Sequence, residues 1–244
     1  MKFPKYRKVA SFAASAILLS SLSLMAGTKK VAGNLVDSGT FGVYVNGKRV
    51  ASEKFEIVQS PEMSVAKAEL KLDESKNAQM AELQMKPNGD LIRYQWSEKD
   101  QGTAVVEPKD EFLVEHVTIV QPAKSAEQPF ILPPSTQILD DYFFSQRQLL
   151  LWRYLSSQCR IAPGQKGCEL KPTQFGVIVP RQQSSAQVTV EYAGQQKLSV
   201  RGSDQEMSRF TFKTEGGDWN IWMDSAYKIQ KIAIVGDNTE VVRD

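Results

Sequence analysis

Few residues of this sequence are of a type that could do chemistry. The chain has a single histidine, His116, which lies in the alternating segment 114–118 and so is predicted to sit on a strand. A catalytic histidine needs a nucleophile or an acid within hydrogen-bond reach. The sequence contains no Gly-x-Ser-x-Gly motif and no second histidine. We therefore predict that the protein is not an enzyme.

The neighbouring acids Asp140 and Asp141 could be taken for a catalytic pair. Adjacent residues of a helix point about 100° apart, so these two carboxylates would not converge on one substrate. Acids in the first turn of a helix are favoured by the helix dipole, and we assign them that role. Phosphate loops, dinucleotide fingerprints and calcium loops are absent from the sequence. We expect no cofactor and no metal.

The two cysteines, Cys159 and Cys168, are separated by nine positions, with a turn-rich segment between them. A zinc site is disfavoured, because no histidine or further cysteine lies near enough to complete four ligands. We predict a disulfide between them, which would contribute about 2–3 kcal/mol through loop closure. Two free thiols are the alternative if the chain is not exported.

Aromatic side chains are the strongest candidates for a ligand surface, although large aromatic residues also dominate ordinary cores. A hydrophobic groove lined by such residues would bind apolar ligands. The residues predicted to line it are Tyr94, Trp96, Phe143, Leu150, Trp152 and Trp219.

The elements that must position these residues are mainly strands. Alternating apolar and polar residues recur from 37 to about 120, and Asn46-Gly47 is a strong hairpin signal. Residues 121–134 contain four prolines and are predicted to be a linker. Strands resume after the cysteine loop, with one turn expected at Ala193-Gly194-Gln195. About a dozen strands are more than a flat open sheet usually carries.

One long helix is predicted over residues 136–157, capped by Ser135 or Thr136. Apolar side chains cover most of its circumference, so it should be largely buried. The predicted fold is mainly β: a single strongly curved antiparallel sheet, or incomplete β-barrel, with one long apolar helix packed in its concave side. It forms one half-barrel domain over residues 37–244.

The N-terminus is typical of an export signal. Residues 1–26 combine a basic start with an apolar stretch, and small residues follow, so cleavage is expected between 26 and 33 and a flexible leader over 27–36. An uncleaved signal anchor that tethers the protein to a membrane is the alternative. The predicted location is the periplasm.

The net charge of +2 depends on this segment. Residues 1–26 contain four basic residues and no acid, so the remainder has 26 basic and 28 acidic residues. A nucleic-acid partner is not expected, because phosphate binding requires a basic surface.

Three segments carry a resemblance to a known family: Gly39-Thr40-Phe41-Gly42-Val43-Tyr44-Val45-Asn46-Gly47-Lys48-Arg49-Val50, Leu139-Asp140-Asp141-Tyr142-Phe143-Phe144 and Ala226-Tyr227-Lys228-Ile229-Gln230-Lys231-Ile232. In their order and architecture they resemble exported proteins of the periplasmic lipoprotein-carrier (LolA- and LolB-like) half-barrel superfamily. The resemblance implies an incomplete antiparallel barrel whose open side is covered by helix, with a hydrophobic cavity for acyl chains. Carriers of this type have several lid helices, whereas a single helix is predicted here.

We therefore expect a non-enzymatic periplasmic protein that binds a lipid, an acyl chain or a lipid-modified partner in a hydrophobic groove. A lipid or a lipoprotein is the expected partner, and peripheral contact with a membrane is compatible with this function. The alternative is an envelope structural or interaction protein with a filled core and no small-molecule ligand. The oligomeric state is left open, because exposed sheet edges could pair between chains.

Overall fold

The computed structural model describes residues 33–244 except 160–166 and 201, and the side chain of Val200 is also left out. The predicted signal segment 1–26 and most of the predicted leader lie outside the described residues. The first strand begins at Asn34, so the last three positions of that leader belong to the sheet.

The described residues form one large unclosed sheet of fifteen strands and a single α-helix. In the sheet the strands follow the order β8-β7-β6-β5-β4-β3-β2-β1-β15-β14-β13-β12-β11-β10-β9. Neighbouring strands are antiparallel except β9 and β10, which are parallel. The bounds are β1 Asn34–Val45, β2 Lys48–Gln59, β3 Ser64–Leu72, β4 Gln79–Met85, β5 Leu91–Glu98, β6 Gly102–Lys109, β7 Phe112–Ile119, β8 Lys124–Phe130, β9 Gln137–Ile138, α1 Ser145–Gln158, β10 Thr173–Val179, β11 Ser184–Val200, β12 Ser203–Thr214, β13 Gly217–Met223, β14 Ile229–Ile234 and β15 Thr239–Arg243, with a short 3-10 helix η1 over Pro180–Gln182.

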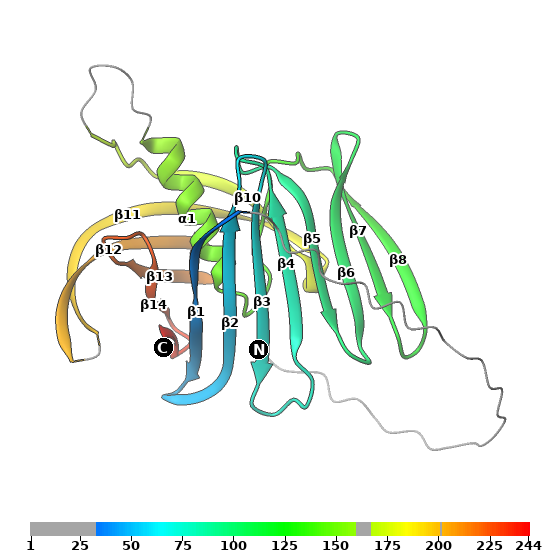
Figure 1. The fold of residues 1–244 in the computed structure, drawn as a ribbon, viewed down its shortest axis with the longest axis horizontal. Coiled ribbons are helices and arrows are strands. Elements are labelled where there is room, and N and C mark those ends of the chain that lie inside the picture. Colours follow the sequence, from blue (N-terminus) through cyan, green and yellow to red (C-terminus); the bar gives the residue numbers. More distant parts are fainter. Residues whose placement is uncertain (1–32, 160–166, 201) are drawn as a thin grey trace. The chain divides into compact units, whose positions relative to one another are not determined.

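The sheet bends so that its two limbs enclose α1. Figure 1 shows β1–β8 standing side by side in blue to green, while β11 and β12 in yellow to orange form a curved band that runs across them. The limbs are joined by β1 and β15, which place the two ends of the domain side by side. The mainly β fold, the single sheet and the single helix are confirmed.

The predicted hairpin at Asn46-Gly47 is confirmed. Both residues have positive φ, at 51° and 75°, and they connect β1 to β2. A two-residue turn of this hand matches the twist of the strands that it joins.

Two predicted breaks in the sheet are wrong. Residues 124–130, assigned to a linker, form the edge strand β8, where Pro129 is tolerated because one side of an edge strand needs no N–H donor. The expected turn at Ala193-Gly194-Gln195 is a bulge within the long strand β11, marked by a register shift between Tyr192 and Gly194. Gly194 has a φ of 96°, which allows the strand to bend without ending.

The prediction of one long apolar helix over 136–157 is also wrong, because α1 spans only Ser145–Gln158. Gln137 and Ile138 instead pair with β10, and the N–H of Leu139 continues this pairing to Ile178 O at 3.0 Å. Tyr142 then adopts a φ of 62°, which a right-handed helix cannot contain. Asp140 and Asp141 are therefore not in the first helical turn.

The first turn of α1 is polar as well as buried. Its four opening residues, Ser145, Gln146, Arg147 and Gln148, are all buried, and the apolar residues that follow pack into the core. Tyr154, for example, meets the ring of Phe210 from β12 edge-on, with ring centroids 6.2 Å apart. The helix therefore fills the concave side of the sheet and needs polar partners there.

Glu53 of β2 is one of these partners and takes the place of a helix cap. Its Oε2 accepts a hydrogen bond from Phe144 N–H at 2.6 Å, and its Oε1 accepts one from the Ser145 hydroxyl at 2.6 Å. Burial raises the pKa of Glu53 to about 7, although these hydrogen bonds oppose the rise. Since Phe144 has no polar side chain, the orphan N–H groups of the helix are satisfied by a distant strand.

The predicted disulfide is confirmed. Cys159, directly after α1, is bonded to Cys168 with an S–S distance of 2.02 Å.

We predict that Glu53→Ala lowers the free energy of unfolding by about 1–3 kcal/mol, because it leaves the donors of Phe144 and Ser145 buried without an acceptor. Urea unfolding at pH 7.5 measures the change. Glu56→Ala, an exposed glutamate on the same strand, is the matched control and should change stability little. Equal stability of the Glu53→Ala variant and the wild type would contradict the capping role.

Candidate functional site

A groove lies beside the C-terminal half of α1. Its volume is about 500 Å³. It is bounded by the start of β1, by the disulfide and by the turn between β13 and β14. The lining residues are Val36, Gln59, Trp152, Leu155, Ser156, Cys159, Cys168, Ala226 and Tyr227. We call it the apolar groove.

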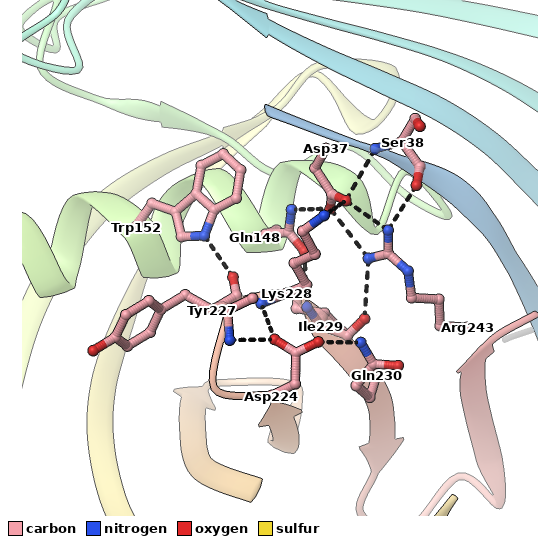
Figure 2. A network of polar contacts seen from close by, with 11 residues as sticks. Asp37, Ser38, Gln148, Trp152, Asp224, Tyr227, Lys228, Ile229, Gln230 and Arg243 are labelled. Carbon is pink, nitrogen blue, oxygen red and sulfur yellow. Dashed lines mark hydrogen bonds and ion pairs between the residues drawn. The ribbon is translucent and has the colours of Figure 1, made fainter. Parts of the chain in front are cut away.

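Trp152 is the central side chain of this groove. Its indole N–H donates a hydrogen bond to the carbonyl oxygen of Tyr227 at 2.6 Å, which joins α1 to the turn opposite (Figure 2). The Tyr227 side chain is 54% exposed. One face of the groove is therefore fixed by a hydrogen bond, while an aromatic ring at its rim stays accessible.

The turn that carries Tyr227 is organised by Asp224. Its Oδ1 accepts hydrogen bonds from the N–H groups of Ala226 and Lys228, both at 2.9 Å. Its Oδ2 accepts one from Gln230 Nε2 at 2.7 Å (Figure 2). An aspartate that bonds to backbone N–H groups downstream holds a turn in one conformation. This holds the Tyr227 carbonyl where Trp152 can reach it.

Beside the groove, the buried carboxylate of Asp37 links four elements. It accepts hydrogen bonds from Gln148 of α1 at 2.6 Å and from Arg243 of β15 at 2.6 Å, and Lys228 Nζ lies 3.1 Å away (Figure 2). Burial alone would raise the pKa of Asp37, but the hydrogen bonds from Arg243 and Gln148 outweigh it and lower the pKa. The Gln148 side chain also accepts a hydrogen bond from Ile229 N–H at 2.8 Å. These contacts join β1, α1, β14 and β15 into one rigid unit.

A second, smaller depression of about 180 Å³ lies next to the first and shares Gln59, Trp152 and Ser156 with it. We call it the polar groove. Arg153 forms part of it and donates a hydrogen bond to Gly89 O, with Asp90 Oδ1 at 3.8 Å from Arg153 Nη2. The lining residues are Gln59, Ser64, Met85, Lys86, Pro87, Asn88, Gly89, Gln137, Leu149, Trp152, Arg153 and Ser156.

The six residues predicted to form a ligand groove are not brought together. Tyr94, Phe143 and Leu150 are fully buried in the core and line neither groove. A ligand could reach them only by displacing α1. Apolar spacing alone does not separate a core position from a groove position, which is why these three were included.

Two of the other predicted residues pack against arginine side chains. Arg181 lies over the ring of Trp96, 5.7 Å from its centroid, and Arg147 lies over Trp219 at 5.0 Å. Such contacts stabilise a guanidinium that has been taken out of water. Trp152 is the one predicted residue that lines both grooves.

Sequence reasoning missed Val36, Leu155, Ala226 and Tyr227 as groove residues. Leu155 was counted with the buried face of the helix, and Val36 was placed in a leader. The signal that could have found Tyr227 was local: an aromatic residue three positions after Asp224, in a segment already noted for its resemblance, is typical of an exposed turn.

Asp140 has a structural role that differs from the predicted one. Its side chain is buried, accepts a hydrogen bond from the Tyr94 hydroxyl and lies 2.9 Å from Arg181 Nε. Burial and the nearby Asp140 charge raise the pKa of Tyr94 well above its usual value. The carboxylate is therefore held between partners that stabilise its charge, and it fixes the segment before α1 against the sheet.

Glu115 of β7 is the least compensated acid in the described part of the chain. It is 0% exposed, and neither carboxylate oxygen has a hydrogen-bond partner. Burial raises the pKa of Glu115 to about 7, and repulsion from Asp140 adds to the rise. Its neighbour His116 is half-buried, with Nδ1 3.5 Å from Glu127 Oε2. Among the described residues, no three His, Cys, Asp or Glu side chains are grouped to hold a metal ion.

Comparison with protein-family models, with curated proteins and with solved structures found no match to this chain. Within the described ranges, no helix has both the length and the apolar character needed to cross a membrane.

We predict that Glu115→Gln stabilises the protein selectively at high pH. The pKa of Glu115 is about 7 in the folded chain against 4.5 for an ordinary glutamate. Between these two pH values the folded state therefore binds more protons than the unfolded state. Ionisation therefore removes stability as the pH rises from about 4.5 to 7, and the loss persists above that window.

Because one pKa unit corresponds to about 1.4 kcal/mol, the variant should gain about 1–3 kcal/mol over the wild type between pH 4.5 and pH 8. Denaturant unfolding at both pH values measures the gain. Glu111→Gln, at an exposed position two residues before Leu113, is the control and should show the same difference from the wild type at each pH. A pH-independent difference for Glu115→Gln would show that Glu115 titrates normally.

Proposed function

We propose that this chain is a non-enzymatic binding protein that holds a lipid, an acyl chain or the acyl chain of a lipid-modified partner in the apolar groove beside Trp152. The observation that carries the proposal is the lining of that groove. Among its nine lining residues none carries a charge, and Val36, Trp152, Leu155 and Tyr227 offer aliphatic and aromatic surface. The volume of about 500 Å³ lies within the usual range for small-molecule sites.

The rigidity of the groove supports the same function. The Trp152–Tyr227 hydrogen bond and the Asp37 network fix its walls before any ligand arrives. A preformed site avoids the loss of conformational freedom that binding would otherwise require. Each methylene buried contributes roughly 0.8 kcal/mol, so burying about fifteen apolar carbons of a chain such as palmitate would supply about 12 kcal/mol, and a loss of about 4 kcal/mol on association leaves about 8 kcal/mol. Micromolar binding of a long chain is the expected range.

The proposed location is the periplasm, or another oxidising compartment reached by export. The Cys159–Cys168 disulfide supports this, because structural disulfides persist outside reducing compartments. The signal segment 1–26, on which export depends, lies outside the described residues. Tethering through an uncleaved signal anchor is the alternative for the same segment.

A second function is favoured by the filled concave side. Because α1 fills the concave side of the sheet, this alternative has no ligand there, and the protein would act through its surface as an envelope interaction protein. The observation specific to this alternative is a set of exposed apolar residues near the β7–β8 edge: Phe112, Ile119, Val120 and Ile131.

The test is calorimetric titration of the full chain with palmitate below its micellar concentration. The wild type should bind with a micromolar Kd, and Trp152→Ala should weaken binding at least tenfold, because it removes the largest apolar surface of the groove. Phe112→Ala removes an exposed aromatic side chain that is 44% accessible and lies outside both grooves, so it is the matched control and should leave the Kd unchanged.

Absence of binding by the wild type would contradict the proposed function and favour the interaction protein. Equal loss of affinity in both variants would mean that palmitate binds outside the apolar groove. Thermal unfolding of each variant without ligand separates a lost contact from a lost fold.

A further inference from the structure

We infer that the ligand is an anionic amphiphile, with its chain in the apolar groove and its negatively charged head group in the polar groove beside Lys86 and Arg153. This inference rests on the proposed function and adds the chemical class of the ligand. It follows from the shared lining of the two grooves and from the difference in their charge.

The two grooves are neighbours that share part of their lining. Gln59, Trp152 and Ser156 line both of them. A molecule lying along the face of Trp152 would therefore extend from one groove into the other. Since the polar groove holds only about 180 Å³, below the range for a whole small-molecule ligand, it suits a compact head group better than a second chain.

The charge of the lining changes from one groove to the other. The residues of the apolar groove include no Asp, Glu, Lys, Arg or His. Those of the polar groove include Lys86 and Arg153 and no acid. Asp90 faces Arg153 at 3.8 Å but does not line the groove, so one of the two positive charges remains uncompensated. Together the two grooves offer an apolar surface and a cationic surface, as an anionic amphiphile requires.

Arg153 is held in place before a ligand binds. It donates a hydrogen bond to Gly89 O, and the turn at Gly89 packs so closely that an added Cβ would lie 2.9 Å from Arg153 Nη1. Burial lowers the pKa of Arg153, and only Asp90 opposes this effect, so an additional anion nearby would stabilise the guanidinium. Guanidinium groups bind the paired oxygens of carboxylates and phosphates through two donors at once.

The experiment measures the affinity of the full chain for three ligands that share a twelve-carbon chain: dodecyl phosphate, dodecanol and dodecyltrimethylammonium, each below its micellar concentration. Wild-type protein should bind dodecyl phosphate about tenfold more tightly than dodecanol and bind the cation most weakly. Inorganic phosphate alone is the fourth ligand and should bind at least a hundredfold more weakly than dodecyl phosphate.

Lys86→Glu reverses one charge of the polar groove without removing a hydrogen bond that holds the fold. It should bring the phosphate-to-ammonium affinity ratio to one or below. Lys99→Glu makes the same charge change at the β5–β6 turn, at the opposite end of β5 from Lys86, and should keep the wild-type ratio. Arg153→Lys keeps the charge and should retain more of the preference than Arg153→Gln.

Equal affinity for the three dodecyl ligands would overturn this inference while leaving the proposed function intact. Inorganic phosphate binding as tightly as dodecyl phosphate would also overturn it, because the site would then serve a free anion. If none of the dodecyl ligands bound, the proposed function itself would fail.

Discussion

The fold depends on placing a helix with a polar first turn inside an apolar, curved sheet. Such a helix end brings unsatisfied N–H groups and side chains into a place without water, where each unpaired group costs free energy. Glu53 resolves this by accepting hydrogen bonds from the first residues of α1, and Asp37 does so by accepting one from Gln148. Both carboxylates come from the first two strands, so the helix is fixed to the limb of the sheet that carries β1 and β2. The short length of α1 follows from the same arrangement, because the helix begins where its partners are.

The site depends on these anchors in turn. With the helix held deep in the sheet, the concave side is filled by side chains such as Phe143 and Leu150, and the accessible apolar surface lies beside the C-terminal half of α1. There the last turns of the helix, the start of β1 and the Tyr227 turn meet around Trp152. The neighbouring polar groove, which shares Trp152 with the apolar groove, adds positive charge beside it. One helix thus carries both features: its first turn anchors it to the sheet, and its last turns line the candidate site.

The sequence predicts the features that depend on near neighbours in the chain. The Asn46-Gly47 hairpin and the Cys159–Cys168 disulfide are of this kind, because turn chemistry and short spacing determine them.

The features that depend on distant parts of the chain are not predicted. The helix starts later than predicted because Gln137 and Ile138 pair with β10, a strand far away in the sequence, instead of forming helix. Pro129 suggested a linker because its compatibility with a strand appears only once that strand is known to lie at an edge. The aromatic residues of the candidate site could not be sorted from those of the core, since burial depends on the depth at which the helix is anchored.

We propose that an acyl chain lies against Trp152 beside the C-terminal half of α1 and not between the helix and the sheet. Contact quenching of tryptophan fluorescence with a bromine-labelled fatty acid distinguishes the two positions, in full-length variants that each retain one tryptophan. We expect saturable quenching of the variant with Trp152 alone and no quenching of the variants with Trp96 or Trp219 alone. Quenching of Trp96 or Trp219 with Trp152 unaffected would refute this position, because it would place the fatty acid within the concave side of the sheet.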